Sequence, residues 1–398
     1  MERKKRILYV CQTDPRETAY GGMQRTHVIW KGLKSIENCD VWTIIPVPHR
    51  KFESQDEKDN IQWICFDKRY SIGWLFQRIL RRIIPEISIP LGVSCNRLKK
   101  LDAPQFDVVI SRYINPAAYL RLWTIAPLVI DVDDIPTETA TFDNVGLMRR
   151  LFTHAKYYLL KEWQEKSCKH AKCLWLPDPR QGAAFHMIDI ACLPNIPLTL
   201  GATALRMRRT NNRLRRTFGF VGYLAHQPNH QSLDSFITTR WNIIKKHYPE
   251  AKYKIAGGGL PDAFKNEWVK YDGIELLGYV DNLDEFYESV DAILMPMENG
   301  SGTCIKTLEA LSHSMPVIST PQGLRGISKE HWTVMNGILP FATVDELLRI
   351  ISELPGCLHD DELMSNSRKL IENEYSQKKV NGVITETLKR IWDDIKRM

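Results

Sequence analysis

The sequence predicts an α/β protein with two Rossmann-like domains that face each other across a cleft. Three observations lead to this prediction. The chain has 398 residues, which is more than one hydrophobic core usually serves. Short apolar runs rich in β-branched residues alternate with helical patterns, as is typical of a parallel sheet with helices between its strands. The alternation begins again near residue 217, so a second sheet of the same kind is expected.

The strands of both series are expected to be buried on both faces, because polar residues do not alternate with the apolar ones. In the first series we expect strands at residues 7–10, 41–46, 61–66, 107–111, 128–132 and 172–176, and helices at 27–33 and 151–167. In the second series we expect strands at residues 218–223, 252–256, 274–277, 292–297 and 316–319, and helices at 233–247, 283–289 and 305–311. Ligands of such sheets bind beyond the carboxyl ends of the strands, which places the expected site in the cleft.

The domain boundary is expected where a proline-containing stretch gives way to an arginine-rich one. This gives a first domain at 1–198, a linker at 199–216, a second domain at 217–375 and a terminal helix at 376–398 that packs back toward the first domain. The arginines of this stretch are Arg206, Arg208, Arg209, Arg213, Arg215 and Arg216. A solvated linker is the favoured interpretation, and binding of phosphates or lipids is the alternative.

Composition narrows the classes of partner. The net charge of +7 is modest, and no nucleic-acid recognition motif accompanies it, so no nucleic-acid partner is expected. The nine cysteines form no Cys-x-x-Cys pair, which favours a reduced protein without structural zinc. No segment has the roughly 20 apolar residues of a membrane span. We therefore expect a cytoplasmic protein whose membrane contact, if present, is peripheral and at the inner face of an anionic membrane.

The strongest functional motif follows the expected strand 292–297. Its turn consists of Asn299, Gly300, Ser301, Gly302 and Thr303. Small residues let a ligand approach the backbone closely, and the start of the following helix adds positive potential, so the turn suits a diphosphate. Lys306 and Glu309 are three residues apart and share one helix face. One can meet phosphate charge while the other accepts hydrogen bonds from ribose hydroxyls; a routine surface Lys–Glu pair is the alternative.

Three other strand ends in the second half are rich in glycine, and together with the turn they favour a nucleotide-binding crevice. The residues concerned are Gly222 and Tyr223 followed by Asn229, then Gly257 in a run of three glycines, and Gly278 followed by Tyr279 and Val280. Each turn alone carries little information, since glycine is common in the loops between strands and helices.

These motifs, in this order, resemble group 1, or family 4, retaining glycosyltransferases of the GT-B fold. The resemblance covers most of the second half: residues 220–223, 255–259, 278–281, 300–303, Lys306 with 308–310, and 316–320. In the first half it is looser and rests on residues 21–25, which resemble the family's glycine loop beside the transferred sugar, and on 193–197, which resemble the element that closes the first domain.

The resemblance implies roles for the matching positions. Glu309 would bind the donor ribose, and the backbone near Tyr279 and Val280 would hold the base. Lys306 and the amides of residues 300–303 would stabilise the departing diphosphate, and these two side chains are the expected catalytic pair. The other expected donor-binding residues are Gly21, Gly22, Gly222, Tyr223, Asn229 and Gly257.

The sequence departs from the family pattern at two places. Ser301 stands where many members have the first glutamate of a pair, and Tyr223 stands where many have an arginine that neutralises the diphosphate. Pro228 or Asn229 falls near the position of a lysine that many members also have. Charge neutralisation would then rest on Lys306, the helix start and backbone amides.

The family resemblance implies a retaining, metal-independent transfer. The acceptor hydroxyl attacks the face of the sugar that the nucleotide leaves, without a covalent nucleophile. The donor would be a nucleotide-diphosphate sugar and the acceptor a saccharide or a lipid-linked sugar, in the synthesis of a surface polysaccharide or glycolipid.

Weaker candidates lie in the first half. Asp131, Asp133 and Asp134 follow the strand expected at 128–132, and with Arg25 they are candidates for acceptor binding; a divalent metal site and loop capping are the alternatives for the aspartates. Apolar residues at helical spacing within 76–84, with Arg78, Arg81 and Arg82 on the remaining face, fit either a basic helix on an anionic membrane or a helix packed on its own sheet.

Three other functions remain to be considered. A Rossmann dehydrogenase is disfavoured, because no spaced glycine fingerprint directly follows the first strand. A GT-B-type nucleotide-sugar epimerase would need an acid/base set that the sequence does not reveal. A catalytically silent nucleotide-sugar-binding subunit stays open, because the first glutamate is missing.

Overall fold

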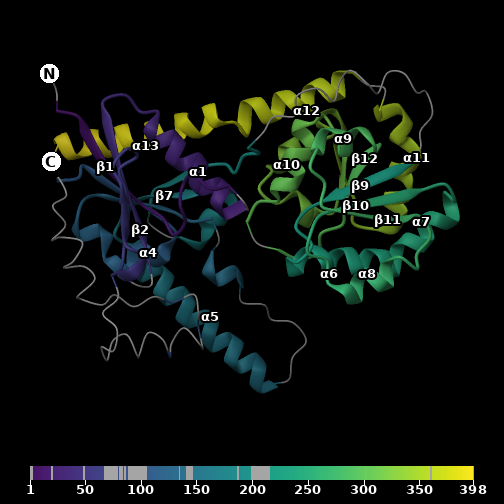
Figure 1. Cartoon of the computed structure of the whole chain (residues 1–398), viewed down its shortest axis with the longest axis horizontal. Helices are drawn as coiled ribbons and strands as arrows, with labels where there is room; N and C mark the ends of the chain where they lie inside the picture. The colour runs from purple at the N-terminus through teal and green to yellow at the C-terminus, as the bar shows by residue number, and fades with distance from the viewer. Residues whose placement is uncertain are drawn as a thin grey trace. The chain divides into compact units, whose positions relative to one another are not determined.

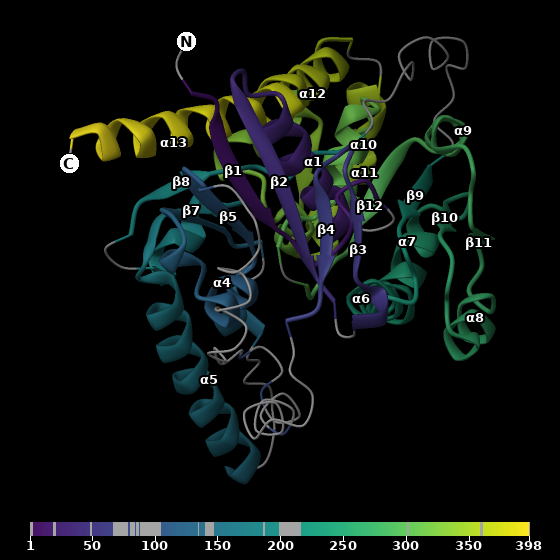
Figure 2. The same cartoon turned by 60° about the vertical axis from the view of Figure 1, so that its left-hand side comes forward.

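The computed structural model describes residues 3–18, 21–47, 50–66, 79, 84, 87, 105–133, 135–139, 147–185, 188–198, 216–300, 302–358 and 361–397 (Figures 1 and 2). The chain divides into two compact units. Unit 1 comprises Met1–Pro194 and Gln377–Met398, and unit 2 comprises Asn195–Ser376. Each unit is built on a sheet of parallel strands, which confirms the predicted α/β class with two parallel-sheet domains. The cleft expected between them stays a prediction.

Unit 1 contains an eight-stranded sheet in the order β3-β4-β2-β1-β5-β6-β7-β8. Its strands are β1 (Lys5–Val10), β2 (Cys39–Pro46), β3 (Ser54–Asp56), β4 (Ile61–Ile64), β5 (Val108–Arg112), β6 (Leu128–Asp131), β7 (Ala171–Leu176) and β8 (Ile190–Cys192). All pairings are parallel except that of β3 with β4. The central strands are apolar and buried along nearly their whole length, as expected for a sheet covered on both faces.

The helices of unit 1 are α1 (Gly21–Lys34), α4 (Ile114–Leu120), α5 (Leu147–Cys168) and α13 (Gln377–Arg397). Single 3-10 turns lie at Arg50–Phe52, Leu122–Thr124, Pro136–Thr139 and Pro179–Ala184. α1 and α13 lie on one side of the sheet, and α4 and α5 lie on the other (Figures 1 and 2). The core includes Leu8, Val109 and Ile130 from the sheet and Ala117 and Cys168 from α4 and α5.

The end of the chain belongs to unit 1 because α13 packs against α1 and β7. A Cβ added at Gly32 of α1 would stand 2.7 Å from Cδ1 of Ile384, so the two helices approach closely. Trp175 of β7 donates its indole N–H to the hydroxyl of Thr387 on α13 over 3.2 Å. These contacts join residues more than 200 positions apart in the sequence.

Unit 2 contains a six-stranded, wholly parallel sheet in the order β11-β10-β9-β12-β13-β14. Its strands are β9 (Thr217–Val221), β10 (Lys252–Ala256), β11 (Ile274–Gly278), β12 (Ala292–Met295), β13 (Val317–Ser319) and β14 (Ile338–Pro340). The chain adds β10 and β11 on one side of β9 and then β12 on the other side. The order therefore reverses between β9 and β12, and the carboxyl ends of such neighbouring strands are the usual place for a ligand.

The helices of unit 2 are α6 (Gln227–Phe236), α7 (Asn242–His247), α8 (Asp262–Trp268), α9 (Leu283–Glu288), α10 (Ile305–Ser312), α11 (Val344–Leu358) and α12 (Asp361–Glu374). Short 3-10 turns lie at Pro321–Leu324, Lys329–His331 and Val334–Asn336. α6, α7 and α8 lie on one side of the sheet, and α9, α10 and α12 lie on the other (Figure 1). Local sequence fixes several helix starts: Pro228 stands in the first turn of α6, and Asn282 caps α9 by accepting from two backbone amides.

The structure corrects several predicted elements. The single helix expected at 233–247 is instead α6 and α7 joined by a π-helical turn at Ile237–Trp241. The sequence analysis did not predict β3, β8 and β14, which are three residues each, nor α4, α8, α11 and α12. Three residues are too few to show a period, so such short strands are hard to predict from the sequence.

Two predictions fall outside the described residues. The linker predicted at 199–216 is described only at Arg216, which forms an ion pair of 2.6 Å with Glu250. The amphipathic segment at 76–84 is described only at Ile79 and Ile84. Among the helices that the structure describes, none is long and apolar enough to cross a membrane.

Candidate functional site

The candidate site of unit 2 lies where the strand order reverses, beyond β9 and β12. The segment that leads from β12 into α10 carries the predicted turn. Its backbone requires glycine: Gly300 has a φ of 131° and Gly302 a φ of 63°, both in the region that L side chains rarely adopt. A Cβ at Gly300 would also stand 2.6 Å from a terminal nitrogen of Arg325. Ser301 lies outside the described residues.

Arg325 fastens this turn to the loop after β13. Its Nε donates to the carbonyl of Gly302 over 3.0 Å, and its backbone carbonyl accepts from the amide of Cys304 over 3.1 Å. Gln322 donates to the carbonyl of Gly300 over 2.9 Å. The sequence analysis missed Arg325, although a positive charge between Gly323 and Gly326 after the last predicted strand is a signal that could have drawn attention to it.

Lys306 lies in the first turn of α10, and its side chain passes over the end of β9. A Cβ at Gly222 would stand 2.7 Å from Cε of Lys306 and 2.9 Å from its Cδ. The ammonium donates to Oδ1 of Asn229 over 2.9 Å, and the amide of Asn229 in turn donates to the carbonyl of Tyr223 over 2.7 Å. Among the described residues Lys306 has no carboxylate partner. The neutral amide of Asn229 therefore holds the Lys306 ammonium in place without neutralising its charge.

Glu309 lies one turn further along α10 and is half-buried. Lys306 and Glu309 form no ion pair with each other, and in the described part of the chain neither forms one with any other residue. Burial raises the pKa of the Glu309 carboxyl to about 6, and the positive charge of Lys306 offsets only part of that effect. The alternative of a routine Lys–Glu surface pair therefore does not describe α10.

The pKa shifts of two other groups near the start of α10 indicate a positive electrostatic potential there. Burial alone would raise the pKa of the Cys304 thiol, but Lys306, Arg325 and hydrogen bonds with Thr307 lower it below its ordinary value. Burial, followed by the charge of Lys306, lowers the pKa of the His226 imidazole. The hydroxyl of Thr303 is buried and has no hydrogen-bond partner in the described structure. This end of α10 is therefore suited to hold an anion.

The glycine-rich strand ends of unit 2 lie side by side in the order β11, β10, β9. Gly257 has a φ of 144°, and a Cβ there would stand only 1.8 Å from the carbonyl oxygen of Gly222. Gly278 has a φ of 69° and is followed by Tyr279, which is 77% exposed. Tyr223 is 67% exposed. The structure thus gathers Gly222, Gly257 and the Tyr279–Val280 turn along one edge of the sheet.

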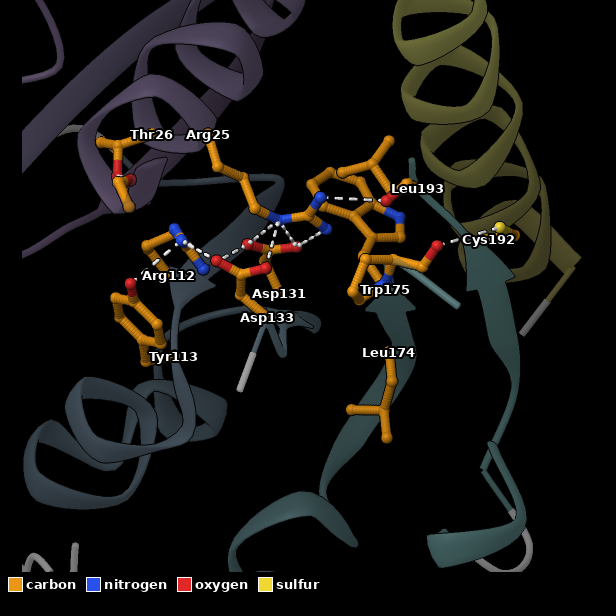
Figure 3. Close-up of polar contacts among 12 residues, drawn as sticks. Arg25, Thr26, Arg112, Tyr113, Asp131, Asp133, Leu174, Trp175, Cys192 and Leu193 are labelled. Carbon is orange, nitrogen blue, oxygen red and sulfur yellow. Dashed lines mark hydrogen bonds and ion pairs between the residues drawn. The ribbon is translucent and has the colours of Figure 1, made fainter. Parts of the chain in front are cut away.

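The candidates of unit 1 belong to a buried network at the corresponding edge of its own sheet (Figure 3). Arg25 of α1 donates to Asp131 from Nε over 3.0 Å and 3.1 Å, and to the carbonyl of Leu193 from Nη1 over 3.0 Å. Arg112 donates to Asp131 and to Asp133, each over 2.8 Å. Two positive and two negative side chains therefore balance each other without contact with water, apart from Asp133, whose side chain is 13% exposed.

This network changes what Arg25 and Asp131 offer. The Arg25 side chain is 1% exposed and is fully engaged in this network, so it presents no free donor to an acceptor. Asp131 is wholly buried, whereas Asp133 keeps an exposed edge. The sequence analysis did not predict the pairing, because it joins residues 106 positions apart. Asp134 lies outside the described residues.

Tyr113 adjoins the network with a backbone φ of 74°, which is unusual for a residue with a side chain. Its ring lies 3.9 Å from the guanidinium carbon of Arg112, and its hydroxyl accepts from Arg112 over 3.0 Å. Gly21 and Gly22, expected in a loop, instead form the first turn of α1. In the described part of the chain no three His, Cys, Asp or Glu side chains gather as a metal site; the expected metal independence stays a prediction.

Comparison with known proteins shows what unit 2 is similar to. Residues 215–354 match the family model described as glycosyl transferases group 1. The matched residues include the turn, α10 with Lys306 and Glu309, and the three glycine-rich strand ends. The finer assignment to family 4 stays a prediction.

Solved structures extend the likeness to both units. A glycosyltransferase from Rickettsia africae has a TM-score of 0.62 at 14% identity, covering 98% of this chain and 99% of that one. WaaG, described as involved in lipopolysaccharide biosynthesis, has 0.57 at 13%, covering 97% and 99%. HepE of Anabaena, solved with UDP and glucose, has 0.56 at 12%, covering 97% and 100%. Such low identities show the fold alone, which is the GT-B fold with two parallel-sheet units.

One curated relative is recognisable by sequence. An uncharacterized 44.6 kDa protein in the cps region of Klebsiella pneumoniae is 28% identical over 171 residues, which cover 40% of this chain and 43% of that protein. The match thus spans less than half of the relative's length.

Proposed function

We propose that the chain is a retaining glycosyltransferase that moves a sugar from a nucleotide-diphosphate sugar to an acceptor hydroxyl. The arrangement of α10 is the observation that carries this proposal. A lysine and a glutamate lie one turn apart at the strand-order reversal, and neither is neutralised by a described residue. Leaving a positive charge without a carboxylate costs stability in an empty protein, and a diphosphate would compensate that cost.

Lys306 would stabilise the diphosphate as it leaves. Its ammonium is held by Asn229 at 2.9 Å, so it is oriented before any ligand arrives. The start of α10, with the amide that follows Gly302, would provide further positive potential at the same place. Because bond cleavage places negative charge on the leaving group, such fixed donors stabilise the transition state more than the ground state.

Glu309 would accept hydrogen bonds from the ribose hydroxyls. Its carboxylate has no described hydrogen-bond partner that would compete with a ligand. The base would then extend along the sheet edge toward β10 and β11, where Gly257 leaves room and Tyr279 and Val280 follow the end of β11. Uridine diphosphate is the first nucleotide to test, because the HepE structure holds UDP.

The acceptor is assigned to unit 1. Asp133 is held by Arg112 at 2.8 Å and lies 3.9 Å from Nε of Arg25, and its side chain is 13% exposed, so this exposed edge would meet an acceptor hydroxyl. We propose a saccharide or lipid-linked acceptor and a role in surface polysaccharide or glycolipid synthesis on the cytoplasmic side of the membrane. WaaG, whose fold is similar, is described as acting in lipopolysaccharide biosynthesis.

Calorimetric titration with uridine diphosphate and its sugars tests the donor site. We expect binding by the natural chain and a fall of about 10-fold to 100-fold for Lys306→Met, since hydrogen bonds of charged groups contribute about 1.5–3 kcal/mol. Lys265→Met is the matched control, because this exposed lysine of α8 lies outside the site. Equal affinity for the three proteins would refute the assignment of Lys306.

Turnover separates an enzyme from a silent binding subunit. The sugar nucleotide that binds most tightly in the titration is incubated with the protein and candidate acceptors, and the product is analysed by NMR. Retention of the anomeric configuration is expected. Inversion would exclude the proposed mechanism, and nucleotide binding without transfer or hydrolysis would favour the silent subunit.

A further inference from the structure

Tyr223 presents a large aromatic side chain to solvent directly after β9, on a backbone that is held in place. The residue is 67% exposed. Its carbonyl accepts from the side-chain amide of Asn229 over 2.7 Å and from the backbone amide of His226 over 3.3 Å. The position of Tyr223 is therefore fixed, although most of its surface is uncovered.

The ring of Tyr223 lies beside the glycine run that follows β10. The amide of Leu224 donates to the carbonyl of Gly258 over 2.9 Å, so the residues after β9 run alongside those after β10. A Cβ added at Gly259 would stand 3.1 Å from Cε2 of Tyr223, and Gly259 has a φ of 79°. Glycine at this position therefore permits the turn and also leaves the space that the ring occupies.

The side chains of Tyr223 and Lys306 lie on different sides of the end of β9. The order of the strands is β10-β9-β12, and α10, which carries Lys306, follows β12. The Lys306 side chain covers Gly222, whereas the Tyr223 ring reaches Gly259 in the loop after β10. The ring is thus on the side toward which the nucleotide base is proposed to extend, and Lys306 is on the side proposed for the diphosphate.

A tyrosine contributes different interactions from the arginine that many group 1 glycosyltransferases have at this position. An arginine can neutralise phosphate charge, but a tyrosine has a flat apolar ring with a hydroxyl at its end. Every nucleobase has a π-face that can stack on such a ring, and stacking adds affinity for any of the bases. The side chain of Tyr223 is therefore suited to the nucleoside and not to the diphosphate.

We propose that Tyr223 is the platform on which the base of the donor nucleotide stacks. This inference rests on the proposed function and assigns one residue to one part of the donor. Stacking on Tyr223 orients the base, while Glu309 accepts from the ribose and Lys306 meets the diphosphate. The ring then contributes to the affinity for the donor without changing the charge that stabilises the leaving group.

Binding measurements with parts of the donor test the assignment. Uridine, adenosine and guanosine diphosphate are titrated first, and the tightest of them is compared with its monophosphate and with pyrophosphate. Tyr223→Leu keeps apolar bulk but has no π-face. Its affinity for the diphosphate and for the monophosphate should fall by the same factor, about 5-fold to 100-fold, because both ligands contain the base. Its affinity for pyrophosphate, which has no base, should not change.

A conservative variant and a spectroscopic signature separate stacking from a merely structural role. Tyr223→Phe keeps the π-face and should bind all three ligands as the natural protein does. In NMR spectra the protons of the bound base should be shifted upfield by the ring in the natural protein and in Tyr223→Phe, and this shift should be absent in Tyr223→Leu. A melting temperature that is the same for all three proteins is expected, since the side chain is exposed.

Tyr158→Leu is the matched control, because this tyrosine of α5 in unit 1 is 66% exposed and should leave nucleotide binding unchanged. Lys306→Met should give the opposite pattern and weaken pyrophosphate. Three results would overturn the assignment: an unchanged affinity of Tyr223→Leu for the monophosphate, a loss that extends to pyrophosphate, or a loss confined to the nucleotide sugar, which would place the ring against the transferred sugar. In all three cases the natural protein still binds its nucleotide and the proposed function stands, whereas failure of the natural protein to bind any of the three nucleoside diphosphates would remove both.

Discussion

Replacing Glu309 by glutamine should make the empty protein more stable while it weakens donor binding. Burial raises the pKa of this carboxyl to about 6 from the ordinary 4.5. A carboxyl with a higher pKa in the folded state keeps its proton while the unfolded chain releases one. The ionisation of Glu309 therefore lowers the free energy of unfolding. This effect is close to zero below about pH 4.5 and reaches its full size above about pH 6.

The magnitude follows from the two pKa values. At about 1.4 kcal/mol for each pH unit, the interval between 4.5 and about 6 lowers the free energy of unfolding by about 2 kcal/mol at pH 8. At pH 5 the same calculation gives about 1 kcal/mol. Glutamine has nearly the shape of glutamate and no charge, so Glu309→Gln should recover these amounts. The affinity for a nucleoside diphosphate should fall about 10-fold or more, because a neutral acceptor replaces a charged one.

Urea denaturation at pH 8 and at pH 5, together with calorimetric titration, measures both effects. Glu353→Gln, which removes an exposed carboxylate on α11, is the control and should change neither quantity. A Glu309→Gln protein that is less stable than the natural one at pH 8 would show that a native partner of Glu309 exists. A stability gain that is equal at both pH values would refute the role of burial.

Three further predictions concern the candidate donor site of unit 2 and the buried ion-pair network of unit 1. Lys306→Met should lower turnover about 10-fold or more without changing the melting temperature, because this lysine has no described ion pair; kinetics and a thermal scan check this. Gly222→Ala should raise KM for the donor, since the new Cβ would displace the Lys306 side chain, whereas Gly258→Ala meets nothing within 4 Å and should behave as the natural protein does. Asp131→Asn should lower the free energy of unfolding by about 3–5 kcal/mol, because two buried arginines would lose their charge balance. Glu162→Gln breaks only an exposed pair and should unfold at nearly the natural urea concentration.

Much of the donor-site geometry could be predicted because it is local. The spacing of Lys306 and Glu309 places them on one helix face, and glycines mark the turns that a ligand must approach closely. The structure confirms α10 and adds the backbone angles at Gly300 and Gly302. Local sequence did not reveal that Lys306 passes over Gly222, because strand β9 lies more than 80 residues before α10.

The candidate acceptor-binding residues of the first half could not be interpreted from local sequence. Clustered aspartates after a strand are equally consistent with loop capping, a metal-binding site or a sugar-binding site. Only the pairing of Arg25 and Arg112 with Asp131 and Asp133 decides that most of this charge is neutralised inside unit 1. Ion pairs between distant residues leave no period in the sequence, since either partner can be read as an ordinary polar residue.

The sequence by itself determined the fold class, the two series of strands and the motif on α10, because each depends on spacing between near neighbours. The tertiary structure alone decided which charges are balanced and which are left for a ligand. It also decided which contacts hold the terminal helix, predicted to pack back toward the first domain, against α1 and β7. The physical reason is that burial and electrostatic pairing depend on what packs against a residue, and most of those neighbours lie far away along the chain.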